Sequence, residues 1–108
     1  GGERDPGKRP LMGAIAESCG DHVVLTSDNP RGEDPVQILE DIQSGMTREP
    51  SVVQPDRKKA IQIALKCADK KDVVLIAGKG HELKQIVGSD VKFFSDQDTV
   101  RQLLEVNK

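Results

Sequence analysis

The sequence predicts an α/β domain in which a mostly parallel sheet is flanked by helices, and three observations support this. Stretches with helical periodicity alternate with short runs of β-branched residues along the whole chain. Residues 73–77 (VVLIA) form an apolar run without alternation, which is typical of a strand covered on both faces in a parallel sheet. Polar loops follow two of the expected strands, and open α/β sheets bind ligands at such positions.

The expected elements follow one another in a regular order after a loop at residues 1–10 (GGERDPGKRP). Helices are expected at residues 11–19, 36–42, 55–68 and 82–87, with a final helix capped by Ser95 or Asp96. Strands are expected at residues 22–26, 51–54, 73–77 and 91–94. The pattern begins on a loop and a helix, as though the strand leading to Gly1 and Gly2 were missing. We therefore expect a single Rossmann-like domain that lacks its first strand and is a piece of a longer protein.

Composition excludes several function classes. The formal charge is −2, and the chain has two phenylalanines but no tyrosine or tryptophan, so a nucleic-acid-binding surface is not expected. No apolar run approaches the roughly 20 residues of a membrane span, and no signal peptide is visible. Cys19 and Cys67 are far apart in sequence and are expected to be reduced, half-buried side chains. These features together predict a cytoplasmic protein.

Residues 26–35 (TSDNPRGEDP) lie where an expected strand ends and a helix begins. Pro30 and Pro35 restrict their own backbone and that of the residues before them, which favours a stiff loop. Asp34 suits an N-cap, with Pro35 at the first helical position. An ordinary loop of cap and turn residues would have the same composition, so both interpretations remain open on these grounds alone.

Residues 78–81 (GKGH) follow the expected buried strand and resemble a phosphate-binding loop. The strict pattern G-x-x-x-x-G-K-[ST] fails, because Val73 stands at the leading glycine and Gly80 at the hydroxyl position. The dinucleotide pattern G-x-G-x-x-G also fails, because Leu83 replaces its third glycine. A tight turn between two elements explains these glycines better.

Three loops are expected to meet at the carboxyl edge of the sheet: residues 2–9, 27–34 and 78–82. Together they contain the cations Arg4, Arg31 and Lys79, the anions Asp28 and Glu82, and the amide side chain of Asn29. Carboxylates beside the cations would repel a polyphosphate. The set therefore favours a zwitterionic ligand.

The same residues resemble one family. The segments GGERD (1–5), GKRPLM (7–12), TSDNPR (26–31), EDP (33–35) and AGKGHE (77–82) are similar to the C-terminal domain of the Mur ligases. The resemblance covers essentially the whole chain. The motif formed by Asp28, Asn29, Pro30 and Arg31 resembles that of the members that add meso-2,6-diaminopimelate, whereas lysine-adding members depart from it at the arginine.

The resemblance implies an ATP-dependent ligase of peptidoglycan synthesis, which adds meso-diaminopimelate to UDP-N-acetylmuramoyl-L-alanyl-D-glutamate. In that reaction ATP phosphorylates the D-glutamyl γ-carboxylate, and the amine of diaminopimelate then displaces phosphate. Contacts to diaminopimelate are implied for Arg4, Asn29, Arg31, Gly78 and Glu82, with Asp28 and Pro30 shaping the loop. A weaker implication is that Asp5 or Lys8 reaches the nucleotide.

The chain departs from a whole ligase in what it lacks. It contains no phosphate-binding loop, no magnesium site and no region for the UDP-sugar, so ATP and Mg²⁺ are expected mainly on an absent central domain. Residues 1–108 would then be one domain of a three-domain enzyme, with no catalytic or metal-binding residue of its own, and inactive alone. The alternative is a free-standing α/β module that binds a small anion or a nucleotide.

Overall fold

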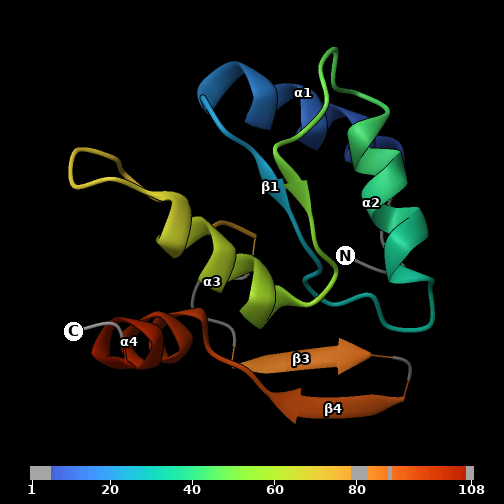
Figure 1. Ribbon diagram of the computed structural model, residues 1–108. Helices are drawn as coiled ribbons and strands as arrows, with labels where there is room; N and C mark the ends of the chain where they lie inside the picture. Colours follow the sequence, from blue (N-terminus) through green and yellow to red (C-terminus); the bar gives the residue numbers. More distant parts are fainter. Residues whose placement is uncertain (1–5, 79–82, 88, 107–108) are drawn as a thin grey trace.

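The fold was analysed in a computed structural model, which describes residues 6–78, 83–87 and 89–106 (Figure 1). The elements, in chain order, are η1 (Pro6–Lys8), α1 (Arg9–Cys19), β1 (Val24–Leu25), α2 (Pro35–Gln43), β2 (Val52–Val53), α3 (Arg57–Cys67), β3 (Lys84–Val87), β4 (Asp90–Phe93) and α4 (Asp96–Val106). Helices expected at residues 11–19, 36–42, 55–68 and after Ser95 are therefore confirmed. No helix in the described ranges is long and apolar enough to cross a membrane.

The main core lies where α2 packs against β1. Leu25 of β1 and three residues of α2, namely Ile38, Leu39 and Ile42, form one buried cluster. The spacing of the three α2 residues places them on one face of the helix. Val23 and Met46 pack against the edge of this cluster. Burial of this face fixes α2, and so fixes the end of the loop that precedes it.

The start of α2 is set by local sequence, as predicted. The Asp34 carboxylate accepts a hydrogen bond from the Val36 amide at 3.0 Å, and Pro35 occupies the first turn. An N-cap side chain satisfies one of the amides that the first helical turn leaves without a partner.

Replacing Asp34 with alanine is expected to lower the free energy of unfolding by about 1 kcal/mol, because the Val36 amide loses this acceptor. Urea denaturation of the chain measures the change. The Asp34→Asn variant keeps an oxygen acceptor and should lose much less. Equal losses for alanine and asparagine would contradict the assignment of a capping hydrogen bond.

Helices α1 and α2 approach so closely that two positions require glycine. A Cβ atom on Gly13 would overlap the carbonyl oxygen of Ile42, and one on Gly45 would overlap that of Pro10. Both obstacles are backbone atoms, which cannot move aside as a side-chain tip can. The pair of glycines therefore sets the distance between α1 and the end of α2.

The turn after α2 is attached to α1 through Glu17. Its carboxylate accepts hydrogen bonds from the Thr47 amide and hydroxyl at 3.0 and 2.7 Å, and from the Arg48 amide at 2.8 Å. The Thr47 amide bond is the main cause that lowers the pKa of Glu17 below its ordinary 4.5. The ionised carboxylate is thus the form that binds the turn.

The stabilisation from Glu17 is expected to be complete above pH 4.5 and to disappear as the pH falls through the lower pKa of the folded state. Carbon-detected NMR should give a Glu17 midpoint below 4.5, and the Thr47 amide proton should shift with the same midpoint. In the Glu17→Gln variant the Thr47 shift should not respond over this range. A Thr47 shift that titrates equally in both proteins would contradict the expectation.

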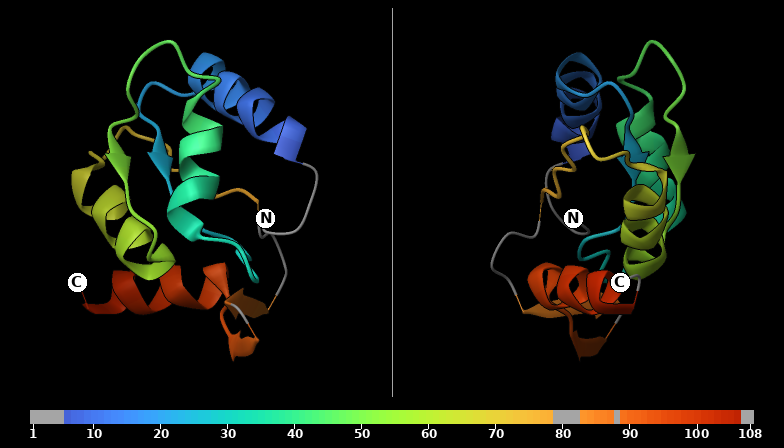
Figure 2. Two further views of the ribbon diagram at one scale, coloured as in Figure 1. Left: turned by 90° about the vertical axis from the view of Figure 1, so that its right-hand side faces the viewer. Right: turned by 60° about the vertical axis from the view of Figure 1, so that its left-hand side comes forward.

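The strands in the described part of the chain form two small sheets. β1 and β2 pair in parallel, with Val24 opposite Val52, which confirms a parallel sheet in an α/β domain, although β1 is shorter than the expected strand at residues 22–26. β3 and β4 pair antiparallel, with Ile86 opposite Val91. The second sheet is a hairpin that lies beside the start of α4. Helix α4 then runs beneath α3 and packs against it (Figure 2).

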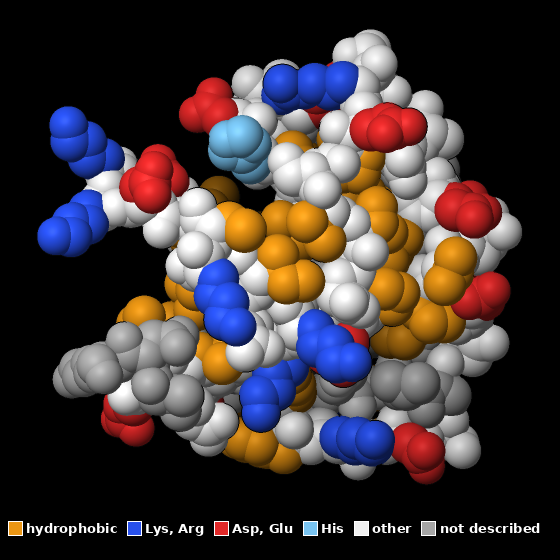
Figure 3. Space-filling model, viewed as in Figure 1, with side chains coloured by type: hydrophobic (Ala, Val, Ile, Leu, Met, Phe, Trp, Pro, Cys, Tyr) orange, Lys and Arg blue, Asp and Glu red, His pale blue; other side chains and the backbone are white. Residues whose placement is uncertain are grey.

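The prediction of a buried strand at residues 73–77 is wrong. This segment has no strand assignment, and the Val73 and Leu75 side chains are 93% and 85% exposed. A strand needs neighbours for its amides and carbonyls, and none of the described strands pairs with this segment. On another face of the domain, hydrophobic side chains are exposed across the middle of the view in Figure 3, where Figure 1 shows β1 and β2.

The prediction of a helix at residues 82–87 is also wrong over its described part. Residues Lys84–Val87 form β3 instead, because each is paired with a residue of β4. Pairing across a hairpin overrides a local helical preference in so short a segment. The expected strand at residues 91–94 is confirmed as β4, and Ser95 caps α4 by accepting from the Asp98 amide. Cys19 and Cys67 are free but exposed, so their expected half-burial is wrong.

Candidate functional site

The loop after β1 is held by strand β3. The Asn29 side-chain oxygen accepts from the Ile86 amide at 3.0 Å, and the Arg31 amide donates to the Ile86 carbonyl at 2.9 Å. The Gln85 side chain donates to the Asp28 carbonyl at 3.3 Å. Three hydrogen bonds over four loop residues leave the loop little freedom, so the loop and β3 form one unit.

Arg31 has an unusual backbone conformation. Its φ is +53°, and it is the one non-glycine residue in the described ranges with a positive φ. A left-handed conformation costs an ordinary L-residue roughly 1–2 kcal/mol. Such strain persists only where the surroundings impose it, and it clusters at ligand-binding sites. The arginine side chain is partly exposed, and its guanidinium donates to the Asn29 carbonyl at 3.3 Å.

The loop after β1 and the segment ending at Gly78 meet at one buried arginine. Arg57 of α3 donates to the Ser27 carbonyl at 3.1 Å and to the Ala77 carbonyl at 3.2 Å. Its remaining hydrogen bonds go to the two carboxylate oxygens of Asp96, both at 2.7 Å. Two of the three loops expected to converge are therefore brought together, because one guanidinium contacts both.

A second buried arginine braces the far end of the same loop. Arg9 donates to both carboxylate oxygens of Glu33 at 3.0 Å and to Asp41 at 2.9 Å. Hydrogen bonding to Glu33 is the main cause that raises the pKa of Arg9 above its ordinary value. Hydrogen bonds from Gln37 and then Arg9 lower the pKa of Asp41. The loop is thus attached to α1 and α2 as well as to β3.

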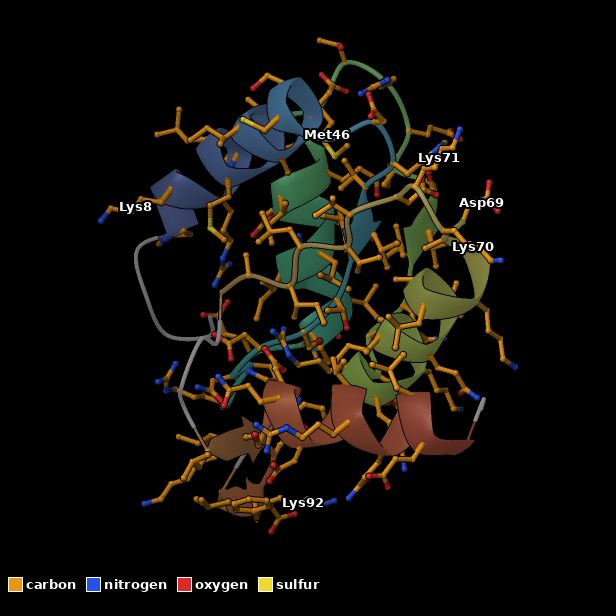
Figure 4. The ribbon with its side chains drawn as sticks, turned by 90° about the vertical axis from the view of Figure 1, so that its left-hand side faces the viewer. Lys8, Met46, Asp69, Lys70, Lys71 and Lys92 are labelled. Carbon is orange, nitrogen blue, oxygen red and sulfur yellow. The ribbon has the colours of Figure 1, made fainter. Side chains whose placement is uncertain are left out.

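The predicted site residues differ in their exposure to solvent, and some of them lie outside the described ranges. Asn29 and Pro30 are buried, and the Asn29 side-chain oxygen accepts from the Ile86 amide. Gly78 is exposed with φ of +102°, a conformation that favours glycine. Lys8 is exposed and points away from the body of the domain (Figure 4). Arg4, Asp5 and Glu82 lie outside the described residues.

Sequence reasoning missed Arg57, Asp96 and Ile86. The burial of Arg57 could have been predicted from the sequence, because it lies one turn before Ala60 and Ile61 and so on the same buried face of α3. A charged residue within such a stripe needs a partner, and Asp96 supplies it. Ile86 contributes only its backbone, so no side-chain pattern could have identified it.

The described residues contain no set of side chains suited to binding a metal ion. Within the described ranges, no three histidine, cysteine, aspartate or glutamate side chains lie close enough to hold a metal ion. Lys8, the described candidate for nucleotide binding, is exposed directly before α1. By contrast, the Thr26 and Ser27 hydroxyl oxygens are buried beside the loop with no hydrogen-bond partner among described groups. Buried hydroxyl groups of this kind are rare in folded proteins.

Comparison with known proteins identifies the family. The family described as "Mur ligase, glutamate ligase domain" matches residues 1–80. Relatives named UDP-N-acetylmuramoyl-L-alanyl-D-glutamate–2,6-diaminopimelate ligase are 49% identical over 108 residues in Vibrio vulnificus and 54% over 105 residues in Ralstonia nicotianae. These alignments cover 99% and 96% of this chain.

A solved structure titled as the same ligase superposes with a TM-score of 0.92 at 41% identity, over 99% of this chain. This chain spans 22% of that structure, and 22% and 20% of the two relatives. The match is therefore to one part of longer proteins. The chain belongs to the Mur ligase family, in which it corresponds to the C-terminal domain.

Proposed function

We propose that this chain is the amino-acid-binding domain of the ATP-dependent ligase that joins meso-2,6-diaminopimelate to UDP-N-acetylmuramoyl-L-alanyl-D-glutamate. Such a ligase acts in peptidoglycan synthesis in the cytoplasm, and so in cell-wall formation, cell shape and division. ATP, Mg²⁺ and the UDP-sugar would be bound mainly by other domains. Residues 1–108 would select the amino acid and orient its amine.

The observation that carries the proposal is the fixed position of Arg31 in a strained left-handed conformation beside β3. A guanidinium fixed in this way can form two parallel hydrogen bonds to one carboxylate of the ligand. Arg4 is proposed to bind a second carboxylate. Glu82 and the Gly78 carbonyl are proposed to hold an ammonium group.

The arrangement of the described residues supports this assignment. Arg57 contacts the residues immediately before Asp28 and Gly78, so the two loops that carry proposed contacts adjoin. The loop after β1 is bonded to β3, which begins at Lys84, two positions after Glu82. Relatives that share about half of this sequence carry the name of the diaminopimelate ligase.

Exposed apolar residues support a domain that works against other domains. In α1, Leu11, Met12 and Ile15 are 63%, 47% and 63% exposed. Extended apolar patches on a domain of this size usually mark an interface. Closure of the other domains over the loops would complete the cleft, so we expect the isolated chain not to catalyse ligation.

The test is a ligation assay with the full-length protein. Release of ADP should require both the UDP-linked dipeptide and diaminopimelate, and lysine should not replace diaminopimelate. Titration of the isolated chain with ATP and with diaminopimelate tests the alternative of a free-standing module. Tight binding of ATP to the isolated chain, or ligation that accepts lysine equally, would contradict the proposal.

A further inference from the structure

We propose that Arg57 is the positioning residue of the amino-acid pocket: its guanidinium fixes the distance between the two loops that contact the ligand. The inference rests on the proposed function, since it concerns the same pocket. Within residues 6–78, 83–87 and 89–106, Arg57 touches no proposed ligand group, and it acts through the backbone of the residues that precede Asp28 and Gly78.

Four of the five N–H donors of the Arg57 guanidinium contact three separate segments. Nε and Nη2 form the two-pronged pair with Asp96, at 2.7 Å each. Nη1 donates to Ser27 at 3.1 Å, and Nη2 also donates to Ala77 at 3.2 Å. The partners lie 30, 20 and 39 positions from Arg57 in sequence. No local turn could hold them together, so the arginine does.

Burial makes this network costly to alter. Arg57 is 3% exposed and Asp96 6% exposed. Removing one partner of a buried charge pair leaves the other charge without compensation. Asp96 neutralises the charge of Arg57. The two hydrogen bonds to backbone carbonyls fix the relative position of the two chain segments. A rigid planar fork can meet three acceptors in fixed directions, and a lysine ammonium cannot.

The geometry links this network to ligand binding. Ser27 adjoins the loop whose Arg31 is proposed to bind a carboxylate, and Ala77 adjoins Gly78, whose carbonyl is proposed to bind an ammonium group. A shift between the two carbonyls would therefore change the distance between the two ends of the pocket. Displacements of about 1 Å at such sites can cost roughly 100-fold in rate.

The experiment compares Arg57→Lys with Arg48→Lys in the full-length ligase. Arg48 is a matched control, because it also donates to two backbone carbonyls, those of Glu17 and Gly20, and pairs with a carboxylate. It is exposed and lies beside the start of β1, at the opposite end from the loops. Steady-state KM values for diaminopimelate, ATP and the UDP-linked dipeptide are measured in parallel with thermal melting.

Arg57→Lys is expected to raise the KM for diaminopimelate roughly 10- to 100-fold. The KM values for ATP and the UDP-linked dipeptide should stay within about two-fold, since this domain's pocket does not hold them. Arg48→Lys should leave all three unchanged. A folded Arg57→Lys enzyme whose KM for diaminopimelate stays within about two-fold, or whose three KM values rise together, would overturn the proposal.

If Arg57→Lys does not fold, the Asp96→Glu variant decides. It keeps the carboxylate charge and leaves both carbonyl bonds available, but its extra methylene displaces the guanidinium, so it should fold and show a smaller but selective rise in the KM for diaminopimelate. A folded Asp96→Glu enzyme with an unchanged KM for diaminopimelate, or with three KM values that rise together, would overturn the proposal. A wild-type ligase that does not use diaminopimelate would refute the proposed function instead, so the two failures are distinguishable.

Discussion

The Arg31→Ala variant of the full-length ligase is expected to lose most of its preference for diaminopimelate over lysine. Diaminopimelate carries a second carboxylate at the end of its side chain, and lysine has none. With lysine bound, the Arg31 guanidinium would lose contact with water without gaining a carboxylate in return, which would penalise lysine in the wild-type protein. Sites built around such a polar partner discriminate by roughly 10⁴-fold, and alanine removes both the attraction and the penalty.

The measured quantity is the ratio of kcat/KM for diaminopimelate to kcat/KM for lysine. It should fall by about 10³-fold or more in Arg31→Ala, mainly through slower use of diaminopimelate. Arg31→Lys keeps the charge but not the fork, so an intermediate ratio is expected.

Arg31→Gly separates the side chain from the backbone. Glycine adopts a φ of +53° without strain, so this variant should be more stable than Arg31→Ala by about 1 kcal/mol, yet equally unselective. If any of these substitutions left the ratio unchanged, Arg31 would not be the residue that selects the amino acid.

Features set by neighbouring residues could be predicted from the sequence. The capping of α2 by Asp34 and of α4 by Ser95 depends on contacts two to four positions away, and both are confirmed. The loop at residues 26–35 is predictable because it follows a strand and carries two restrictive prolines. Helices α1 to α4 could be predicted because apolar residues recur at helical spacing within each of them.

Features set by distant partners could not be predicted in this way. Residues 73–77 have the composition of a buried strand, but pairing depends on a neighbour that their own pattern does not reveal. Residues Lys84–Val87 became a strand because β4 lies across the hairpin. The Asn29 side-chain oxygen is bound by an amide 57 positions away, which the residues around Asn29 in sequence do not reveal. In each case the deciding contact is non-local.

Truncating Leu39 is expected to cost more stability than any surface change in this chain. Leu39 is 1% exposed and lies at the centre of the cluster formed with Leu25, Ile38 and Ile42. Leu39→Ala should lower the free energy of unfolding by about 2–5 kcal/mol, through lost burial and the cavity that remains. Small domains have about 5–15 kcal/mol in total, so the urea midpoint should move visibly.

The matched control for Leu39→Ala is Leu11→Ala, which removes the same atoms from a side chain that is 63% exposed. In the isolated chain the control should change the free energy of unfolding by less than about 1 kcal/mol, because little apolar surface leaves water there. Helix α2 begins directly after the loop that holds Arg31, so Leu39→Ala should also weaken binding of diaminopimelate in the full-length ligase. Equal losses of stability in the two variants would mean that the core does not lie between α2 and β1.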